Sequence, residues 1–215
     1  MSVRLAGHDG PVGFDLDLTL IDSRPAIMAA WTALAAETGA TIDLAAVDRR
    51  MGSKLEDEAA YWFPPAQVEA ATAGYRRHYV RVAPALTTAL PGARESIAAV
   101  RAAGQRAVII TAKHPVSVGP SLEAAGLSAD QVYTHVFGPE KAAVLARIRA
   151  VAYVGDATAD MQAARSAAVR AVGVPTGSFS RNELLEAGAQ AVLDSLTQFP
   201  AWYAGLRAGA ARSGG

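Results

Sequence analysis

The chain has 215 residues, enough for one large domain or for a domain that carries a smaller insertion. Its 20 basic and 20 acidic residues balance to a formal net charge of zero, so we expect neither a nucleic-acid partner nor an acidic membrane surface. The absence of cysteine excludes disulfides, cysteine nucleophiles and thiolate metal sites.

The two ends of the chain carry no pattern of a targeting segment. Arg4, His8 and Asp9 interrupt the N-terminus before any apolar run long enough for a signal peptide. No segment approaches the roughly 20 apolar residues of a membrane span, and we expect a cytoplasmic protein. The C-terminal AGAARSGG, residues 208–215, is expected to be a loose tail, and no pattern indicates an oligomeric state.

The first predicted strand covers residues 12–16 and opens the stretch VGFDLDLTLIDS. In an extended chain alternate residues share a face, so Asp15, Asp17 and Thr19 point one way. Two like charges side by side repel, and a fold tolerates them more readily where a cation binds. The alternative is an exposed edge strand with two solvated acids.

A helical segment interrupts the chain after this strand. Helices are predicted over 24–38, 44–50, 55–62 and 66–79, and Pro84 and the pair Pro91–Gly92 mark the return to strands. Ligands in open α/β sheets bind beyond the carboxyl ends of the strands, so an insertion at this end would cap the site. We expect a cap over 23–86 and a core formed by 1–22 and 87–215.

The rest of the chain alternates between strands and helices. Further strands are predicted over 106–111, 151–154, 170–174 and, more weakly, 191–193. The helices between them cover 93–103, 116–125, 141–149 and 158–167, and Gly104 and Gly126 follow as left-handed caps. This alternation implies right-handed crossovers, and we expect a Rossmann-like, mostly parallel α/β sheet with helices on both faces.

Polar residues follow two of these strands. Thr111 ends VIITAK, and in YVGDATAD the pair Gly155–Asp156 leaves the strand. Taken alone, Thr111 or Asp156 could simply cap the helix that follows.

Asp160 follows Asp156 after one helical turn. Together with Asp15 and Asp17, these acids would converge on one small pocket, which is costly unless a cation lies among them. Oxygen ligands without cysteine or nearby histidine suit Mg²⁺.

Only three of the 20 basic residues are lysines, namely Lys54, Lys113 and Lys141. A surface location is the simple explanation for each. Lys141 opens a helix in FGPEKAAVL, which could start at the carboxyl edge of the sheet if VYTHVF, residues 132–137, forms a further strand. An ammonium near a helix N-terminus opposes the helix dipole, which favours a role in binding an anion.

In this order, DLDLT, IITAK, Lys141 and GDATAD resemble the four motifs of the haloacid dehalogenase superfamily. With its helical insertion, the chain is similar to the phosphoglycolate-phosphatase-like branch over nearly its whole length. Two positions differ from that pattern. Leu18 stands where relatives usually have glycine, which predicts a different turn after Asp17, and no proline follows Lys141. Lys113 is the alternative phosphate-binding lysine, but we expect it to point away.

The resemblance implies a role for each motif residue. Asp15 would be the nucleophile that takes the phosphoryl group, and Asp17 would protonate the leaving oxygen and then deprotonate the attacking water. Thr111 and Lys141 would hold the phosphoryl oxygens. Mg²⁺ would be held by the Asp15 carboxylate, the Asp17 carbonyl and Asp156, with Gly155 and Asp160 in supporting positions.

These roles imply a Mg²⁺-dependent phosphatase that hydrolyses a small phosphomonoester, phosphoglycolate-like or a sugar phosphate, through an aspartyl-phosphate. Fold and core motifs do not select the ester, and the cap would. The residues expected to meet the far end of the substrate are Arg49, Arg50, Lys54 and His78. Solvated helix faces are the alternative for each.

Three other functions stay open. A phosphosugar mutase shares all four core motifs. A phosphonate hydrolase resembles the chain in RRMGSKLED, but Lys54 is one position out of register and such enzymes carry alanine at the position of Asp17. A non-catalytic receiver domain also combines acids, a threonine and a lysine around Mg²⁺, but it is much shorter and lacks the cap.

Overall fold

A six-stranded parallel sheet forms the centre of the computed structural model, which describes residues 10–213. Its order is β5-β4-β1-β6-β7-β8. The strands are β1 (Val12–Phe14), β4 (Ala107–Ile110), β5 (Gln131–Tyr133), β6 (Ala152–Gly155), β7 (Arg170–Gly173) and β8 (Ala191–Val192). The expected α/β class is therefore confirmed, while the N-terminal segment with Arg4, His8 and Asp9 lies outside the described residues.

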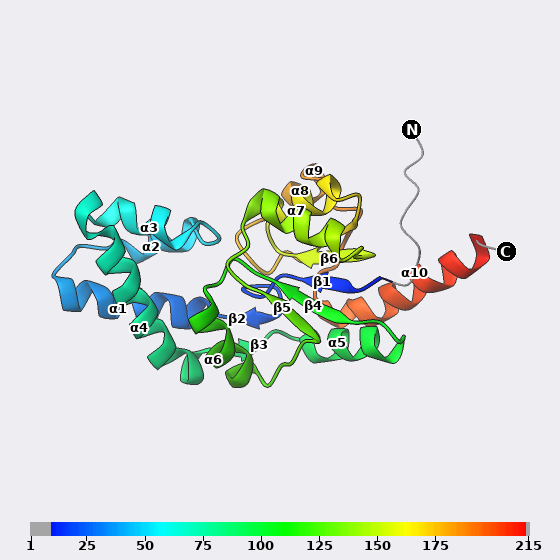
Figure 1. Ribbon diagram of the computed structural model, residues 1–215, viewed down its shortest axis with the longest axis horizontal. Helices are drawn as coiled ribbons and strands as arrows, with labels where there is room; N and C mark the ends of the chain where they lie inside the picture. The colour runs from blue at the N-terminus through cyan, green and yellow to red at the C-terminus, as the bar shows by residue number, and fades with distance from the viewer. Residues whose placement is uncertain (1–9, 214–215) are drawn as a thin grey trace.

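Helices cover both faces of this sheet (Figure 1). One face carries α7 (Gly138–Arg147), α8 (Thr158–Ser166) and α9 (Arg181–Glu186), and the other carries α5 (Ala93–Ala102) and α10 (Phe199–Ser213). Separate apolar clusters fill the two sides, one around Phe14 and Phe199 and the other around Tyr153 and Met161. Since β1 lies between β4 and β6, its apolar side chains anchor the middle of the molecule.

Four helices lie between β2 (Ile21–Asp22) and β3 (Thr88–Ala89), which pair as a small antiparallel ribbon. They are α1 (Arg24–Thr38), α2 (Leu44–Arg49), α3 (Leu55–Trp62) and α4 (Val68–Leu86), with a 3₁₀ turn at Pro65–Gln67. We call α1–α4 the inserted helices, and Figure 1 shows them beside one end of the sheet. Their own core includes Trp31, Phe63 and Tyr79. The division into cap and core at residues 23 and 86 stays a prediction.

The remaining connections contain α6 (Pro115–Ala125), between β4 and β5, and a 3₁₀ turn at Leu196–Gln198 before α10. The further strand that the sequence suggested over 132–137 is present as β5, which begins one residue earlier and ends at Tyr133. No helix within residues 10–213 is both long and apolar enough to cross a membrane.

Two expectations about helix ends are wrong. The helix predicted over 66–79 ends too early, because α4 continues through Pro84 to Leu86. A proline removes only one backbone donor, and the buried neighbours Tyr79 and Ala83 hold this turn of α4 in the core of the inserted helices. The expected loose tail is helical through Ser213, where α10 extends from aromatic side chains such as Phe199 that pack against the sheet.

Two glycines near the ends of α5 give a matched test of packing against backbone strain. Both have left-handed backbones, with φ of 87° at Gly92 and 76° at Gly104. A Cβ at Gly92 would lie 2.2 Å from the backbone nitrogen of Thr197, whereas one at Gly104 would meet no described atom within 4 Å. We expect Gly104→Ala to cost about 1 kcal/mol of unfolding free energy and Gly92→Ala about 2–4 kcal/mol. Urea unfolding measures both, and equal losses would contradict the close approach.

Candidate active site

The site begins where β1 ends. The backbone nitrogen of Asp15 donates to the Val154 carbonyl of β6 at 2.8 Å, which fixes Asp15 at the carboxyl edge of the sheet. The chain then turns tightly, with the nitrogens of Leu20 and Ile21 both donating to the Leu16 carbonyl. Leu18 has a φ of 57°, so this leucine adopts the left-handed backbone that glycine favours. The turn is therefore formed without the glycine of the family pattern.

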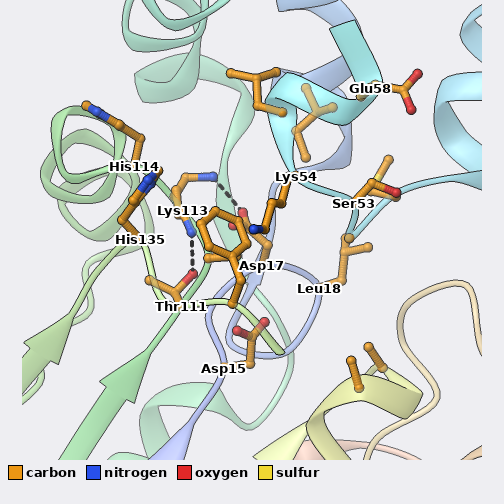
Figure 2. Close-up of a pocket in the computed structure, with 18 of the residues that line it drawn as sticks. Asp15, Asp17, Leu18, Ser53, Lys54, Glu58, Thr111, Lys113, His114 and His135 are labelled. Atoms are coloured by element: carbon orange, nitrogen blue, oxygen red, sulfur yellow. Dashed lines mark hydrogen bonds and ion pairs between the residues drawn. The ribbon is translucent and has the colours of Figure 1, made fainter. Parts of the chain in front are cut away.

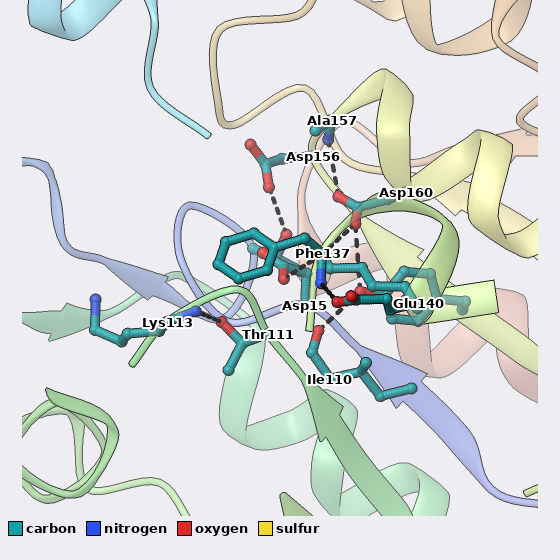
Figure 3. A network of polar contacts seen from close by, with 12 residues as sticks. Asp15, Ile110, Thr111, Lys113, Phe137, Glu140, Asp156, Ala157 and Asp160 are labelled. Atoms are coloured by element: carbon teal, nitrogen blue, oxygen red, sulfur yellow. Dashed lines mark hydrogen bonds and ion pairs between the residues drawn. The ribbon is translucent and has the colours of Figure 1, made fainter. Parts of the chain in front are cut away.

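The carboxylates of Asp15, Asp156 and Asp160 (Figure 3) are buried at this edge together with the ammonium of Lys141. Lys141 of α7 donates to Asp15 at 2.8 Å and to Asp160 of α8 at 2.7 Å. Asp156 follows β6 and accepts a hydrogen bond from the Thr19 hydroxyl at 2.9 Å. The cluster thus draws its four groups from three segments of the chain, namely the end of β1, α7 and the stretch from β6 into α8.

Asp160 is held on its second oxygen as well. Its Oδ2 accepts from the Ala157 nitrogen at 3.2 Å, and the buried Tyr153 hydroxyl lies 3.3 Å from its Oδ1. A Cβ on Gly155 would lie 2.4 Å from the same Oδ2. Glycine at position 155 is therefore required for this close approach of the Asp160 carboxylate to the strand.

The electrostatics of the cluster favour a cation. Burial raises the pKa of Asp15 to about 7, with Lys141 opposing the shift and Asp160 adding to it. Burial also raises the pKa of Asp156 well above its ordinary value, and Asp15 and Asp160 add to the effect. Burial lowers the pKa of Lys141, but Asp15 and Asp160 outweigh it and raise that pKa well above the ordinary value. One ammonium does not balance three buried carboxylates.

The donor set fits a hard divalent cation. One carboxylate oxygen from each of Asp15, Asp156 and Asp160 lies within 4.8 Å of the others. Oxygen donors of this kind suit Mg²⁺, which binds through one or two carboxylates and retains several waters. The resemblance implies that Asp160 supports either Lys141 or a metal-bound water, and in the structure it lies both at Lys141 and among these oxygens.

The expectation that Lys113 points away is wrong, because its side chain points into the site toward Asp17 (Figure 2). Its Nζ lies 2.6 Å from Asp17 Oδ1, and its backbone nitrogen donates to the Thr111 hydroxyl at 3.1 Å. Residues two apart in an extended chain share a face, so the position of Lys113 two residues after Thr111 favours the side that the structure shows. Thr111 itself is buried at the same edge.

A cavity of about 610 Å³ extends from these groups to the inserted helices. Arg50 donates to Glu58 through two nitrogens at 2.7 and 2.8 Å, and it lines the cavity wall. Lys54 also lines the cavity, and its Nζ lies 4.9 Å from the ring centroid of Phe137. Within residues 10–213, Lys54 forms no ion pair, so its charge faces the cavity unopposed by a carboxylate partner.

The structure does not bring Arg49 or His78 to this cavity. Arg49 is largely exposed and lies 3.9 Å from Asp43, while His78 Nε2 lies 2.6 Å from Glu37. Arg49 therefore fits the solvated helix face that the sequence left open, whereas the His78 side chain is only 15% exposed and lies beside Glu37. Of the four expected specificity residues, the cavity therefore includes Arg50 and Lys54.

Sequence reasoning missed several cavity residues. They are Tyr75, Arg76, Tyr79, His114, His135 and Phe137. Only the spacing of Tyr75 and Tyr79 is a signal, because residues four apart share a helix face, but that pattern equally describes a helix packed in an apolar core. His135 and Phe137 come from the turn after β5.

The chain is similar to known hydrolases and phosphatases. Residues 12–174 match the family described as haloacid dehalogenase-like hydrolase. A probable phosphatase IndB from Dickeya dadantii is 30% identical, over 86% of this chain and 89% of that protein. The plasmid phosphoglycolate phosphatase of Cupriavidus necator is 29% identical over 87% and 90%. The crystal structure of a hydrolase from Pseudomonas syringae has a TM-score of 0.72 at 26% identity, over 87% of this chain and 94% of that one.

The raised pKa of Asp156 gives a stability prediction for metal-free protein. A carboxyl group whose pKa is higher in the folded state destabilises the fold as the pH rises above its unfolded value of about 4. Asp156→Asn removes this charge and keeps an oxygen for the Thr19 hydroxyl. At about pH 8 in chelator, we expect the variant to be more stable by about 1 kcal/mol or more, and the gain to shrink toward pH 4. Saturating Mg²⁺ should reverse the order in urea unfolding, and a variant less stable in chelator would contradict the prediction.

Proposed function

Because the chain belongs to the haloacid dehalogenase-like hydrolase family, we propose that it is a Mg²⁺-dependent phosphatase that hydrolyses a small phosphomonoester through an aspartyl-phosphate. The family expected from the sequence is confirmed, and the two relatives are named a probable phosphatase and a phosphoglycolate phosphatase. The observation that carries the mechanism is the buried Asp15 carboxylate at the end of β1, paired with Lys141 and set among further carboxylates.

In the first half of the reaction, an Asp15 oxygen attacks phosphorus and the bond to the ester oxygen breaks. Lys141 and the Thr111 hydroxyl are placed to hold phosphoryl oxygens, since both are buried at the carboxyl edge where Asp15 lies. Asp17 gives its proton to the departing ester oxygen. Mg²⁺ bound among Asp15, Asp156 and Asp160 would neutralise negative charge on the phosphoryl group.

In the second half, Asp17 takes a proton from water as that water attacks the phosphorus of phosphorylated Asp15. The Asp15–phosphate bond breaks, inorganic phosphate leaves and the carboxylate is restored. Asp17 suits both steps because its side chain is partly exposed toward the cavity, whereas Asp15 is buried. Two identical side chains thus take different roles by position.

The inserted helices would choose the substrate. Lys54 is the cavity-lining cation that pairs with no carboxylate in the described part of the chain, and it faces the core residue Phe137. A substrate with a second anionic group, such as the carboxylate of phosphoglycolate or the second phosphate of a sugar bisphosphate, would supply the missing partner. We also propose that it acts in the cytoplasm.

The other candidate functions are not favoured. Both relatives are named as phosphatases, and each aligns over most of its length. A receiver domain would lack the inserted helices, which form one wall of the cavity. A phosphonate hydrolase or a mutase would share the fold. Asp17 argues against the phosphonate hydrolase, and the names of the two relatives argue against the mutase.

Metal removal tests the role of the carboxylate cluster. We expect phosphate release to fall to background in EDTA and to return when Mg²⁺ is added in excess, because the clustered carboxylates repel a phosphate dianion unaided. Release of inorganic phosphate from a panel of phosphomonoesters measures this. Full turnover in chelator would overturn the proposed metal site.

Asparagine variants separate the two aspartates. Asp15→Asn removes the nucleophile, so turnover and phosphoenzyme should both be absent. Asp17→Asn keeps the nucleophile and loses the acid and base, so steady-state turnover should fall roughly 10²–10⁴-fold. With p-nitrophenyl phosphate, whose leaving group needs little protonation, phosphate should accumulate on Asp15 in Asp17→Asn. Intact-mass measurement detects it, and equal impairment of both variants without trapped phosphate would show that the roles are misassigned.

A further inference from the structure

Lys113 is a second buried ammonium in the site, and the proposed mechanism does not use it. Its side chain is 7% exposed, and its Nζ lies 2.6 Å from Asp17 Oδ1. Burial lowers the pKa of Lys113, but Asp17 and Tyr79 outweigh burial and raise it above the ordinary value. Lys113 therefore carries a charge beside the residue assigned as acid and base.

The ammonium of Lys113 also contacts the inserted helices. Its Nζ lies 4.2 Å from the ring centroid of Tyr79 on α4, a cation–π contact. The Tyr79 hydroxyl lies 3.0 Å from Ser121 Oγ on α6, and the Ser121 hydroxyl donates to the Ser117 carbonyl at 2.8 Å. Tyr79 thus links α4 of the inserted helices to α6, and Lys113 lies between Tyr79 and Asp17.

This arrangement orients Asp17. Lys113 occupies Oδ1, within the described residues no protein group bonds the other carboxylate oxygen, and Asp17 lines the cavity. When Asp17 has given up its proton, the new negative charge lies beside the ammonium and is stabilised by it. The backbone of Lys113 is tied to Thr111 as well, so the same turn links the acid and the phosphate-binding hydroxyl.

We propose that Lys113 is a positioning residue that holds Asp17 with its second carboxylate oxygen toward the leaving group, and that Tyr79 makes this alignment depend on the packing of α4 against α6. The inference rests on the proposed phosphatase function. It assigns to the inserted helices an effect on proton transfer, in addition to the choice of substrate.

The test is the dependence of kcat/KM on the leaving group. Substituted phenyl phosphates and glycerol 2-phosphate span good to poor leaving groups, and kcat/KM reports the steps up to phosphorylation of Asp15. Lys113→Met removes the ammonium and keeps an unbranched chain. We expect kcat/KM for glycerol 2-phosphate to fall about 10- to 100-fold, against less than about threefold for p-nitrophenyl phosphate, which gives a steeper dependence on leaving-group pKa.

Further variants separate positioning from other roles. In an Asp17→Asn background, Lys113→Met should not steepen the dependence further, because Lys113 acts through Asp17. Tyr79→Leu should steepen it in part, and it tests the alignment independently if Lys113→Met does not fold. Lys113→Arg should recover much of the shallow dependence. The control is Arg81→Met, which removes an exposed charge from α4 outside the cavity and should leave the dependence unchanged.

Three outcomes would overturn the inference. An equal loss with every leaving group would mean that Lys113 is only structural. A loss seen with phosphoglycolate and not with glycerol 2-phosphate would mean that it binds a second anion of the substrate. A wild-type dependence in both Lys113→Met and Tyr79→Leu would remove the role altogether. If the wild-type protein releases phosphate from no ester, the proposed function fails instead, so the two failures are distinguishable.

Discussion

The burial of three carboxylates around the ammonium of Lys141 is the constraint on which the rest of the structure depends. Asp15 and Asp156 leave neighbouring strands, and Lys141 and Asp160 come from α7 and α8, which pack side by side on one face. Such a cluster is costly in a dry interior unless each charge is paired and hydrogen-bonded. The order β4-β1-β6 brings these segments to one edge, so the sheet topology and the chemistry cannot be separated.

The sheet and the inserted helices contribute different parts of the site. The groups proposed to surround phosphorus all come from the sheet edge and its adjoining helices, where backbone and side-chain hydrogen bonds fix them. The inserted helices contribute the far wall of the cavity, with Lys54 and aromatic rings. Different esters can therefore be selected by changes in the inserted helices while the reacting groups keep their geometry.

The sequence predicts this fold well where its patterns are long. Helices such as α1 and α3 have the predicted bounds, and the five strands stated outright all exist, because apolar runs between glycines leave few alternatives. The ribbon of β2 and β3 was not predicted, since two residues per strand show no alternation. Arg49 and His78 failed as cavity residues because charge on a helix does not reveal which face is turned to solvent.

Lys113 shows the limit of such reasoning most clearly, because its direction depends on contacts from distant parts of the chain. Asp17 lies 96 positions earlier in the sequence, and Tyr79 belongs to an inserted helix. The opening problem of two aspartates side by side is also resolved here, since each has its own ammonium, Lys141 for Asp15 and Lys113 for Asp17. Separate partners give two identical carboxylates separate environments, and in the proposed mechanism that difference would let one act on phosphorus and the other on a proton.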